Sequence, residues 1–201
     1  MNRRRAEWDD LTPTERAQKL GQAGAPALGV TMRVTDQGEL IARSNVVLKS
    51  YWEQPEATAD AIRAQDDDLE FFHTGDGGVI DDEGYITISD RKKDVIISGG
   101  ENVSSIEVED ALFSHPAVAE VCVIGVPSEK WGETVKALVV LAEGQSAGEK
   151  ELIDHCRSKL AHYKCPTSVE FRDVLARTAT GKLQKFLLRA PYWEGFTKQV
   201  N

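Results

Sequence analysis

The chain has 201 residues, of which 41% are hydrophobic and 28% are charged. This composition is typical of a folded protein, and the length suffices for one domain of moderate size or two small ones. The 33 acidic against 24 basic residues give a net charge of −9, which argues against nucleic acid or an anionic membrane as the main partner. No apolar run is long enough to span a membrane and no signal peptide follows the basic start, so we expect a cytoplasmic protein without a transmembrane segment.

Two short helices and a β-hairpin are predicted near the start of the chain. Thr12 can cap a helix whose first turn contains Pro13. From Ala27 onward, apolar and polar residues alternate on both sides of a D-Q-G turn, which is the pattern of a β-hairpin. An Ala-rich segment that begins near Pro55 predicts the second helix.

The β pattern returns in residues 70–89. One strand leads into a Gly-rich turn around Asp76, a second passes through Val79, and a third follows the turn D-D-E-G. The composition then changes to R-K-K-D followed by V-I-I-S-G-G, which predicts another hairpin. We predict a domain boundary near Lys93, where this change occurs.

The last hundred residues alternate between helix and strand patterns. Ser104 with Glu107, and Ser146 with Glu149, have the spacing of capping boxes that open helices. Two buried-type strands are predicted at V-A-E-V-C-V-I-G-V-P and E-T-V-K-A-L-V-V-L-A, a third strand at T-S-V-E-F-R, and a closing helix at Q-K-F-L-L-R. This order predicts a small α+β domain made of two packed layers.

The cysteines Cys122, Cys156 and Cys165 are odd in number and form no C-x-x-C pair, so a disulfide framework is not expected. A metal site is an alternative, because His155 and His162 lie near two of them in sequence. Their spacing matches no common zinc pattern, and Cys156 falls on the apolar face of a predicted helix. We therefore expect core residues and no metal site.

Two candidate binding residues lie before the predicted boundary. Asp76 stands among glycines, where a carboxylate can approach a ligand closely and accept two hydrogen bonds from a ribose diol. The alternative is a turn aspartate that binds its own backbone. Arg91 offers a rigid fork for a phosphate or sugar oxygen, and its alternative is a solvated charge run.

Two further candidates lie after that boundary. Gly99 and Gly100 permit the close approach of another backbone or a narrow ligand, or they form a plain hairpin turn. Lys182 lies in A-R-T-A-T-G-K-L, which fails the pattern of a phosphate-binding loop. A mobile lysine on this flexible loop can neutralise negative charge that develops on a substrate oxygen, or it is a surface lysine.

Three motifs occur in an order that resembles a known family. They are H-T-G-D at residues 73–76, D-R-K-K-D-V-I-I-S-G-G-E-N from Asp90, and R-T-A-T-G-K-L-Q-K at residues 177–185. From about Ala27 to its end, the chain resembles the C-terminal part of the adenylate-forming (AMP-binding) superfamily. The forms G-G-E-N-V-S-S-I-E-V-E and K-W-G-E-T-V-K-A are more similar to acyl-CoA synthetases than to the amino-acid activating branch of the family. They resemble the type that activates fatty and medium-chain acids.

The resemblance implies a fold and a domain division. Residues 1–92 would be the β-rich, partly barrel-like end of a large AMP-binding N-terminal domain. Residues 93–201 would be the AMP-binding enzyme C-terminal domain, a small α+β lid with a short central sheet. The class expected for the whole chain is α+β.

The resemblance also implies an activity, in which an acid, ATP and CoA give acyl-CoA, AMP and pyrophosphate through acyl-AMP. Asp76 and Arg91 would contact the nucleotide, and Lys93 would be the hinge of the small domain. Lys182 would be the catalytic residue of acyl-AMP formation. Gly99 and Gly100 would line the path of the CoA pantetheine during thioester formation.

Members of this family are much longer chains. The resemblance therefore places the ATP phosphate loop, the Mg²⁺ ligands and the acid pocket in a missing N-terminal part, and we expect the truncated chain to be inactive without a complementary N-terminal half. Two alternatives are a non-catalytic module that binds CoA or a carrier protein, and a decayed gene remnant.

Overall fold

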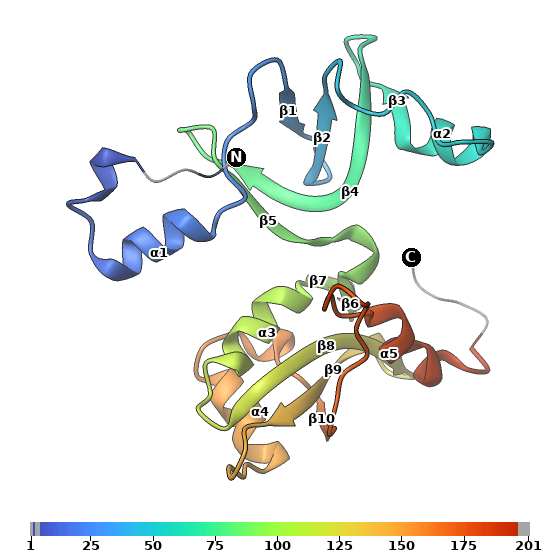
Figure 1. Cartoon of the computed structure of the whole chain (residues 1–201). Coiled ribbons are helices and arrows are strands. Elements are labelled where there is room, and N and C mark those ends of the chain that lie inside the picture. The colour runs from blue at the N-terminus through green and yellow to red at the C-terminus, as the bar shows by residue number, and fades with distance from the viewer. Residues whose placement is uncertain (1, 3–4, 197–201) are drawn as a thin grey trace. The chain divides into compact units, whose positions relative to one another are not determined.

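The computed structural model describes residue 2 and residues 5–196. The chain divides into two compact units, Met1–Lys92 and Lys93–Asn201, termed unit 1 and unit 2. Both units combine helices with β-sheet, which confirms the predicted α+β class, and neither sheet closes into a barrel (Figure 1). None of the helices in the described residues has the length and apolar character needed to cross a bilayer.

Unit 1 is a five-stranded antiparallel sheet accompanied by short helices. Its elements are η1 (Ala6–Trp8), α1 (Pro13–Gly21), β1 (Thr31–Val34), β2 (Glu39–Arg43), α2 (Pro55–Ala61), β3 (Ile62–Ala64), β4 (Glu70–Ile80) and β5 (Ile86–Arg91). The strand order is β1-β2-β4-β3, and β5 pairs with the second half of β4. Both predicted helices and the hairpin are confirmed. Thr12 caps α1, because its hydroxyl accepts the N–H of Glu15 while the Glu15 carboxylate accepts the N–H of Thr12.

The strand β4 corrects one prediction. The sequence predicts a turn at Asp76 between two strands, but β4 runs through this residue without interruption. Gly75 has a φ of +72°, and the pairing with β5 shifts register between Asp76 and Gly78. Glycine adopts such angles without a side-chain clash, so the strand bends and continues instead of ending. Figure 1 shows β4 as a long curved strand.

The core of unit 1 is small. Ile41 and Phe71 are each 1% exposed, and Tyr85 is 3% exposed. Trp8 covers Tyr85, with 5.6 Å between the ring centroids. The segment that carries η1 and α1 therefore packs onto the side of the sheet that carries β5.

Unit 2 is organised around the long antiparallel pair β8–β9. The 3-10 turn η2 (Lys92–Asp94) leads into it, and its further elements are β6 (Ile96–Ser98), β7 (Glu101–Val103), α3 (Ser105–Phe113), β8 (Val118–Ser128), β9 (Gly132–Leu141), α4 (Glu149–Arg157), η3 (His162–Lys164), β10 (Ser168–Phe171) and α5 (Lys185–Trp193). β10 pairs with β9 in parallel, and the hairpin β6–β7 joins the start of β9. The hairpin, the three strands and the closing helix are confirmed.

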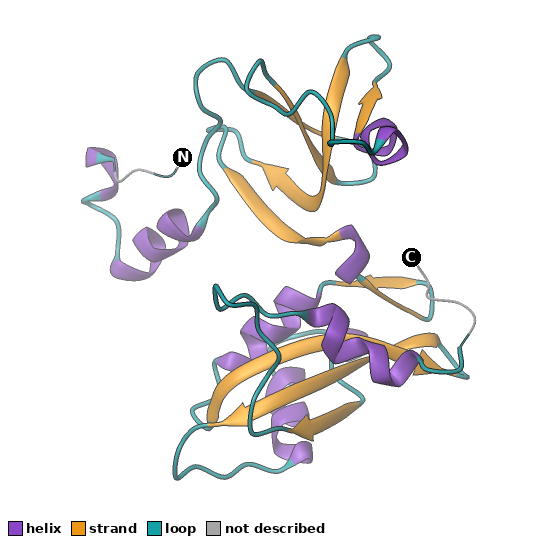
Figure 2. Cartoon of the chain, turned by 45° about the vertical axis from the view of Figure 1, so that its right-hand side comes forward, coloured by secondary structure: helices purple, strands orange, loops and turns teal. Residues whose placement is uncertain are grey.

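Helices cover both faces of this sheet. Alternate residues of a strand face opposite sides, so Val121 and Val123 of β8 pack with α3 and α4, whereas Cys122 and Ile124 pack with Leu188 of α5. The described part of unit 2 therefore has one layer more than the predicted layer pair (Figure 2). Burial on both faces also explains why β8 reads as a continuous apolar run.

The predicted helix caps are only partly correct. The Ser104 hydroxyl accepts the N–H of Glu107 at the start of α3, as predicted, but the Glu107 carboxylate binds Lys164 at 2.7 Å. The cap predicted at Ser146 is wrong.

The helix α4 instead begins after Gly148, whose N–H donates to the carboxylate of Glu151 at 3.2 Å. Glu149 accepts the N–H of Val169 at 2.8 Å. The N–H of Val169, which is distant in sequence, therefore binds the carboxylate that the sequence pattern assigned to the helix cap.

Candidate functional site

The structure brings together two of the predicted site residues, Asp76 and Arg91. They lie directly opposite each other on β4 and β5, and Arg91 Nε is 3.3 Å from Asp76 Oδ1. The two side chains remain 29% and 46% exposed. The guanidinium therefore orients the carboxylate, and a ligand can still reach the pair from solvent.

The backbone before Asp76 is held by Thr74. The Thr74 hydroxyl donates to the carbonyl of Leu40 at 2.7 Å and accepts the N–H of Asp76 at 3.1 Å. These two bonds attach the H-T-G-D segment to β2 at the point where β4 bends.

A buried carboxylate, Glu39 on β2, supports the same segment from inside the unit. Glu39 is 4% exposed and accepts hydrogen bonds from the N–H of Gly75 and from His73 Nδ1, each at 3.0 Å. Lys92 Nζ lies 3.3 Å from the same carboxylate. One side chain thus connects the bend next to Asp76 with the last residue of unit 1.

Sequence reasoning missed Glu39, although a signal was present. In a strand, residues two apart share a face, so Glu39 shares a face with Ile41, an apolar residue two positions later. An acid in phase with a buried residue requires hydrogen-bond partners. The sequence does not show that His73 and Gly75, more than thirty positions away, supply them.

Replacing Glu39 with glutamine is expected to destabilise unit 1 by about 1 to 3 kcal/mol, because a buried charge-assisted network loses its negative charge and one of its two acceptor oxygens. Burial raises the pKa of Glu39, but the bonds from His73, Gly75 and Lys92 together lower the pKa below its usual value. A lowered pKa contributes stability above the unfolded value, about 4.3, and that stability is lost as pH falls. The difference from wild type should therefore shrink below about pH 4.

Urea unfolding of the Glu39→Gln variant across this pH range measures the effect. Asp66→Asn, at an exposed position of the same unit, is the control and should unfold like wild type. An equal loss in both variants, or a loss independent of pH, would contradict the role given to Glu39.

The sequence predicts a flexible loop around Lys182, but in the structure this segment is a hydrogen-bonded turn. Arg177 and Leu183 form an isolated β-bridge, and the N–H of Thr178 donates to the carbonyl of Lys182 at 2.8 Å. The Thr178 hydroxyl accepts the N–H of Lys182 at 3.0 Å, and Gly181 closes the turn with a φ of +84°. The backbone is therefore defined while the Lys182 side chain is exposed.

Gly99 and Gly100 form the turn of the hairpin β6–β7, with φ values of +61° and +88°. Two successive residues in this region are typical of a tight hairpin turn. A Cβ atom on Gly99 would lie 2.8 Å from the ring of Trp131, and the N–H of Gly99 donates to the carbonyl of Trp131 at 3.0 Å. The interpretation as a hairpin turn is confirmed, and Trp131 of the same chain packs against Gly99. The contact with a narrow ligand stays a prediction.

Lys93 is the first residue of unit 2, and its side chain is exposed. Its carbonyl accepts a hydrogen bond from Arg189 Nη1 on α5 at 3.1 Å. The hinge function of Lys93 stays a prediction.

The three cysteines are buried free thiols. Burial raises the pKa of Cys122 to about 12, and burial together with the neighbouring Cys165 raises the pKa of Cys156 to about 12. Such thiols are unreactive core residues. Within the described residues, no group of three or more His, Cys, Asp or Glu side chains is arranged to hold a metal ion.

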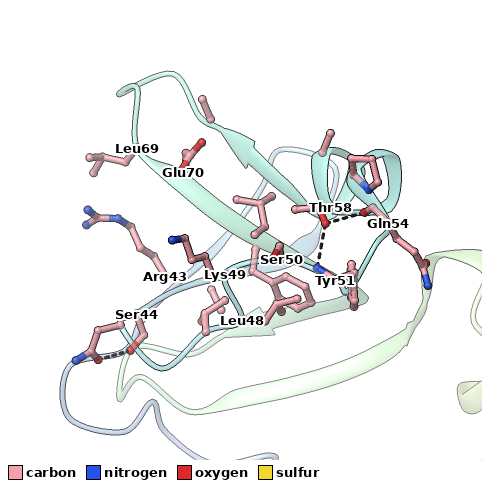
Figure 3. A pocket seen from close by; sticks show the side chains of 18 of the residues that line it. Arg43, Ser44, Leu48, Lys49, Ser50, Tyr51, Gln54, Thr58, Leu69 and Glu70 are labelled. Atoms are coloured by element: carbon pink, nitrogen blue, oxygen red, sulfur yellow. Dashed lines mark hydrogen bonds between the residues drawn. The ribbon is translucent and has the colours of Figure 1, made fainter.

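A cavity of about 1340 Å³ in unit 1 is lined by residues of the segment 42–72, among them Arg43, Tyr51 and Glu70 (Figure 3). The hydroxyl of Thr58 closes the loop beside it, accepting the N–H of Tyr51 at 3.0 Å and donating to the carbonyl of Gln54 at 2.8 Å. The cavity contains none of the residues predicted to carry chemistry.

The bent strand with the H-T-G-D motif lies in unit 1, and the turn with Lys182 lies in unit 2. The structure matches that of ATP-bound MatB from Rhodopseudomonas palustris with a TM-score of 0.79 and 36% sequence identity, over 89% of this chain and 37% of that one. Residues 107–182 match the model of the AMP-binding enzyme C-terminal domain. The chain belongs to the adenylate-forming (AMP-binding) superfamily.

Its relatives include CoA ligases. A probable CoA ligase from Humulus lupulus, CCL11, is 44% identical over 91% of this chain and 35% of its own length. The long-chain-fatty-acid–CoA ligase FadD13 of Mycobacterium tuberculosis is 42% identical over 90% of this chain and 37% of its own length. The chain thus spans about a third of the length of the relatives it matches.

Proposed function

We propose that this chain forms the C-terminal part of an ATP-dependent acyl-CoA synthetase, in which unit 1 is the end of the large AMP-binding domain and unit 2 is the mobile C-terminal domain. The observation that carries this proposal is the 44% identity to a probable CoA ligase over 91% of this chain. The three motifs of this chain also appear in family order. The reaction joins a carboxylic acid to CoA through acyl-AMP.

In the first half-reaction, a carboxylate oxygen of the acid attacks the α-phosphorus of ATP. The new phosphorus–oxygen bond gives acyl-AMP, and pyrophosphate leaves with the electron pair of the broken bond. Asp76 accepts hydrogen bonds from the ribose diol, since its carboxylate is exposed enough to reach a ligand and is oriented by Arg91. Arg91 contacts the same nucleotide.

Lys182 assists this first step. An exposed ammonium at the end of a defined turn can be brought close to the oxygens on which negative charge develops. Mg²⁺ would supply further charge neutralisation at the ATP phosphates. Its ligands are proposed to lie in the part of the relatives that this chain does not cover.

In the second half-reaction, the CoA thiol loses its proton and the sulfur attacks the acyl carbon, so AMP leaves and the thioester forms. Rotation about Lys93 would exchange the Lys182 turn for the turn at Gly99 and Gly100, which lines the pantetheine path. No atom lies within 4 Å of the position that a Cβ on Gly100 would take, and this open space supports the assignment.

We also propose that the acid is a fatty or medium-chain acid and that the reaction takes place in the cytoplasm. The FadD13 name supports the first of these. Chemistry requires the segments that bind the ATP phosphates and the acid, whether a longer form of this protein or a separate polypeptide supplies them.

Reconstitution tests the proposal. The chain is mixed with a polypeptide that covers the remaining N-terminal part of FadD13, and ATP-dependent acyl hydroxamate is measured with a fatty acid and hydroxylamine. The matching C-terminal part of FadD13, combined with the same polypeptide, is the positive control. Activity in both mixtures is expected. An active control beside an inactive mixture would contradict the proposal, and CoA binding by the inactive chain would then indicate a non-catalytic module.

A further inference from the structure

Helix α5 begins three residues after Lys182, and a largely buried ion pair fixes its first residue, Lys185. Lys185 Nζ lies 2.8 Å from Glu109 Oε1 on α3 and 2.5 Å from the hydroxyl of Ser105. The Lys185 and Glu109 side chains are each 17% exposed, and Ser105 is fully buried. An ion pair that is shielded from solvent is screened much less than a surface pair.

The pair is located at the edge of β8. The same oxygen of Glu109 that binds Lys185 also accepts the N–H of Val123 at 2.8 Å. At this edge, the Glu109 carboxylate accepts a backbone N–H that has no neighbouring strand to pair with among the described residues. The carboxylate therefore connects α3, β8 and α5 at one point.

A second ion pair holds the other end of the turn on the same strand. Arg177 donates to Glu120 on β8 and to the carbonyl of Gly181, each at 2.6 Å. Both partners of the Arg177–Glu120 pair are 39% exposed, so the more buried Lys185–Glu109 pair is the stronger constraint. The turn 178–182 is thus attached to β8 on both sides.

We propose that Lys185 and Glu109 are positioning residues that set the location of the Lys182 ammonium for acyl-AMP formation. The inference rests on the function proposed for Lys182. Three residues of chain span at most about 10 Å, and the N–H of Gln184 is bound by the carbonyl of Ala176, so a shift at the start of α5 passes to the turn. A misplacement of about 1 Å can lower a rate about a hundredfold.

Amide hydrogen exchange in the 201-residue chain tests the positioning without any substrate. Lys185→Met removes the ammonium and keeps most of the side-chain volume. We expect at least fivefold faster exchange of the Gly181 and Lys182 amides. Lys185→Arg should restore slow exchange. Glu109→Gln, which keeps an oxygen for the N–H of Val123, should also accelerate exchange and serves as a second variant if Lys185→Met does not fold.

Tyr192→Phe is the matched control on the other end of α5. It removes the hydroxyl that donates to Glu170 at 2.6 Å and should leave the exchange of the turn unchanged. Unchanged exchange in both Lys185→Met and Glu109→Gln, or equal acceleration in Tyr192→Phe, would overturn the inference.

The reconstituted enzyme adds a kinetic test. Lys185→Met should slow acyl-AMP formation at least tenfold and change thioester formation from supplied acyl-AMP less than twofold, because only the first step uses Lys182. Equal losses in both steps would show a purely structural role and overturn the inference. If the wild-type mixture is inactive, the proposed function fails, whereas the exchange experiment still decides the positioning.

Discussion

Replacing Lys182 with alanine is expected to lower the rate of acyl-AMP formation about 10² to 10³-fold in the reconstituted enzyme, which is the usual loss when one group that stabilises developing charge is removed. Thioester formation from supplied acyl-AMP should change little, since the phosphorus–oxygen bond is already made. Pyrophosphate release measures the first step and acyl-CoA production the second. Folding should be unaffected, because the Lys182 side chain is exposed.

Lys159→Ala is the control for this prediction. Lys159 is another exposed lysine of unit 2, in the turn after α4, so its loss removes the same charge from the same unit. Both half-reactions should keep their wild-type rates in this variant. An equal loss of both half-reactions in Lys182→Ala would contradict the role proposed for Lys182.

Alanine at Gly125 is expected to destabilise unit 2 by about 3 kcal/mol, at the upper end of the usual range for overpacking. A Cβ atom there would lie 1.8 Å from Glu133 Oε1 and 2.8 Å from Glu133 Cγ. Glu133 is 2% exposed and is held by the N–H of Ile97 at 2.9 Å. It can move aside only by giving up this bond inside the fold.

Denaturant unfolding measures this loss, with the hydrogen exchange of the β8 and β9 amides as the probe of unit 2. Gly148→Ala is the control, because nothing lies within 4 Å of a Cβ atom there and the change should stay below about 1 kcal/mol. A double-mutant cycle identifies the cause. If the clash is responsible, Gly125→Ala should cost much less when Glu133 is already alanine, and an unchanged cost would contradict this explanation.

Local signals in the sequence were reliable where a few neighbouring residues decide the structure. The helices that begin at Pro13 and Pro55, the hairpin at Gly99 and Gly100, and the strands of unit 2 were predicted correctly. Caps, turns and alternation act over two to four residues, so a single sequence contains them. The order of the three motifs likewise indicated the family that the comparisons then showed.

Local signals failed where a distant partner competed. The Glu149 carboxylate binds the N–H of Val169 instead of capping α4, and the glycines around Asp76 bend a strand that its neighbours keep paired. Both errors come from contacts between residues far apart in sequence, whose energies exceed a local preference.

The sequence by itself therefore determined the α+β class, most of the elements, and the presence of Asp76, Arg91 and Lys182 in a known order. Only the tertiary structure decided that Arg91 faces Asp76, that Glu39 binds the N–H of Gly75 next to Asp76, and that Lys185 meets Glu109 at the edge of β8. The physical reason is strand register and helix packing. Both depend on burying apolar faces from distant segments together, and this global condition fixes which polar groups meet.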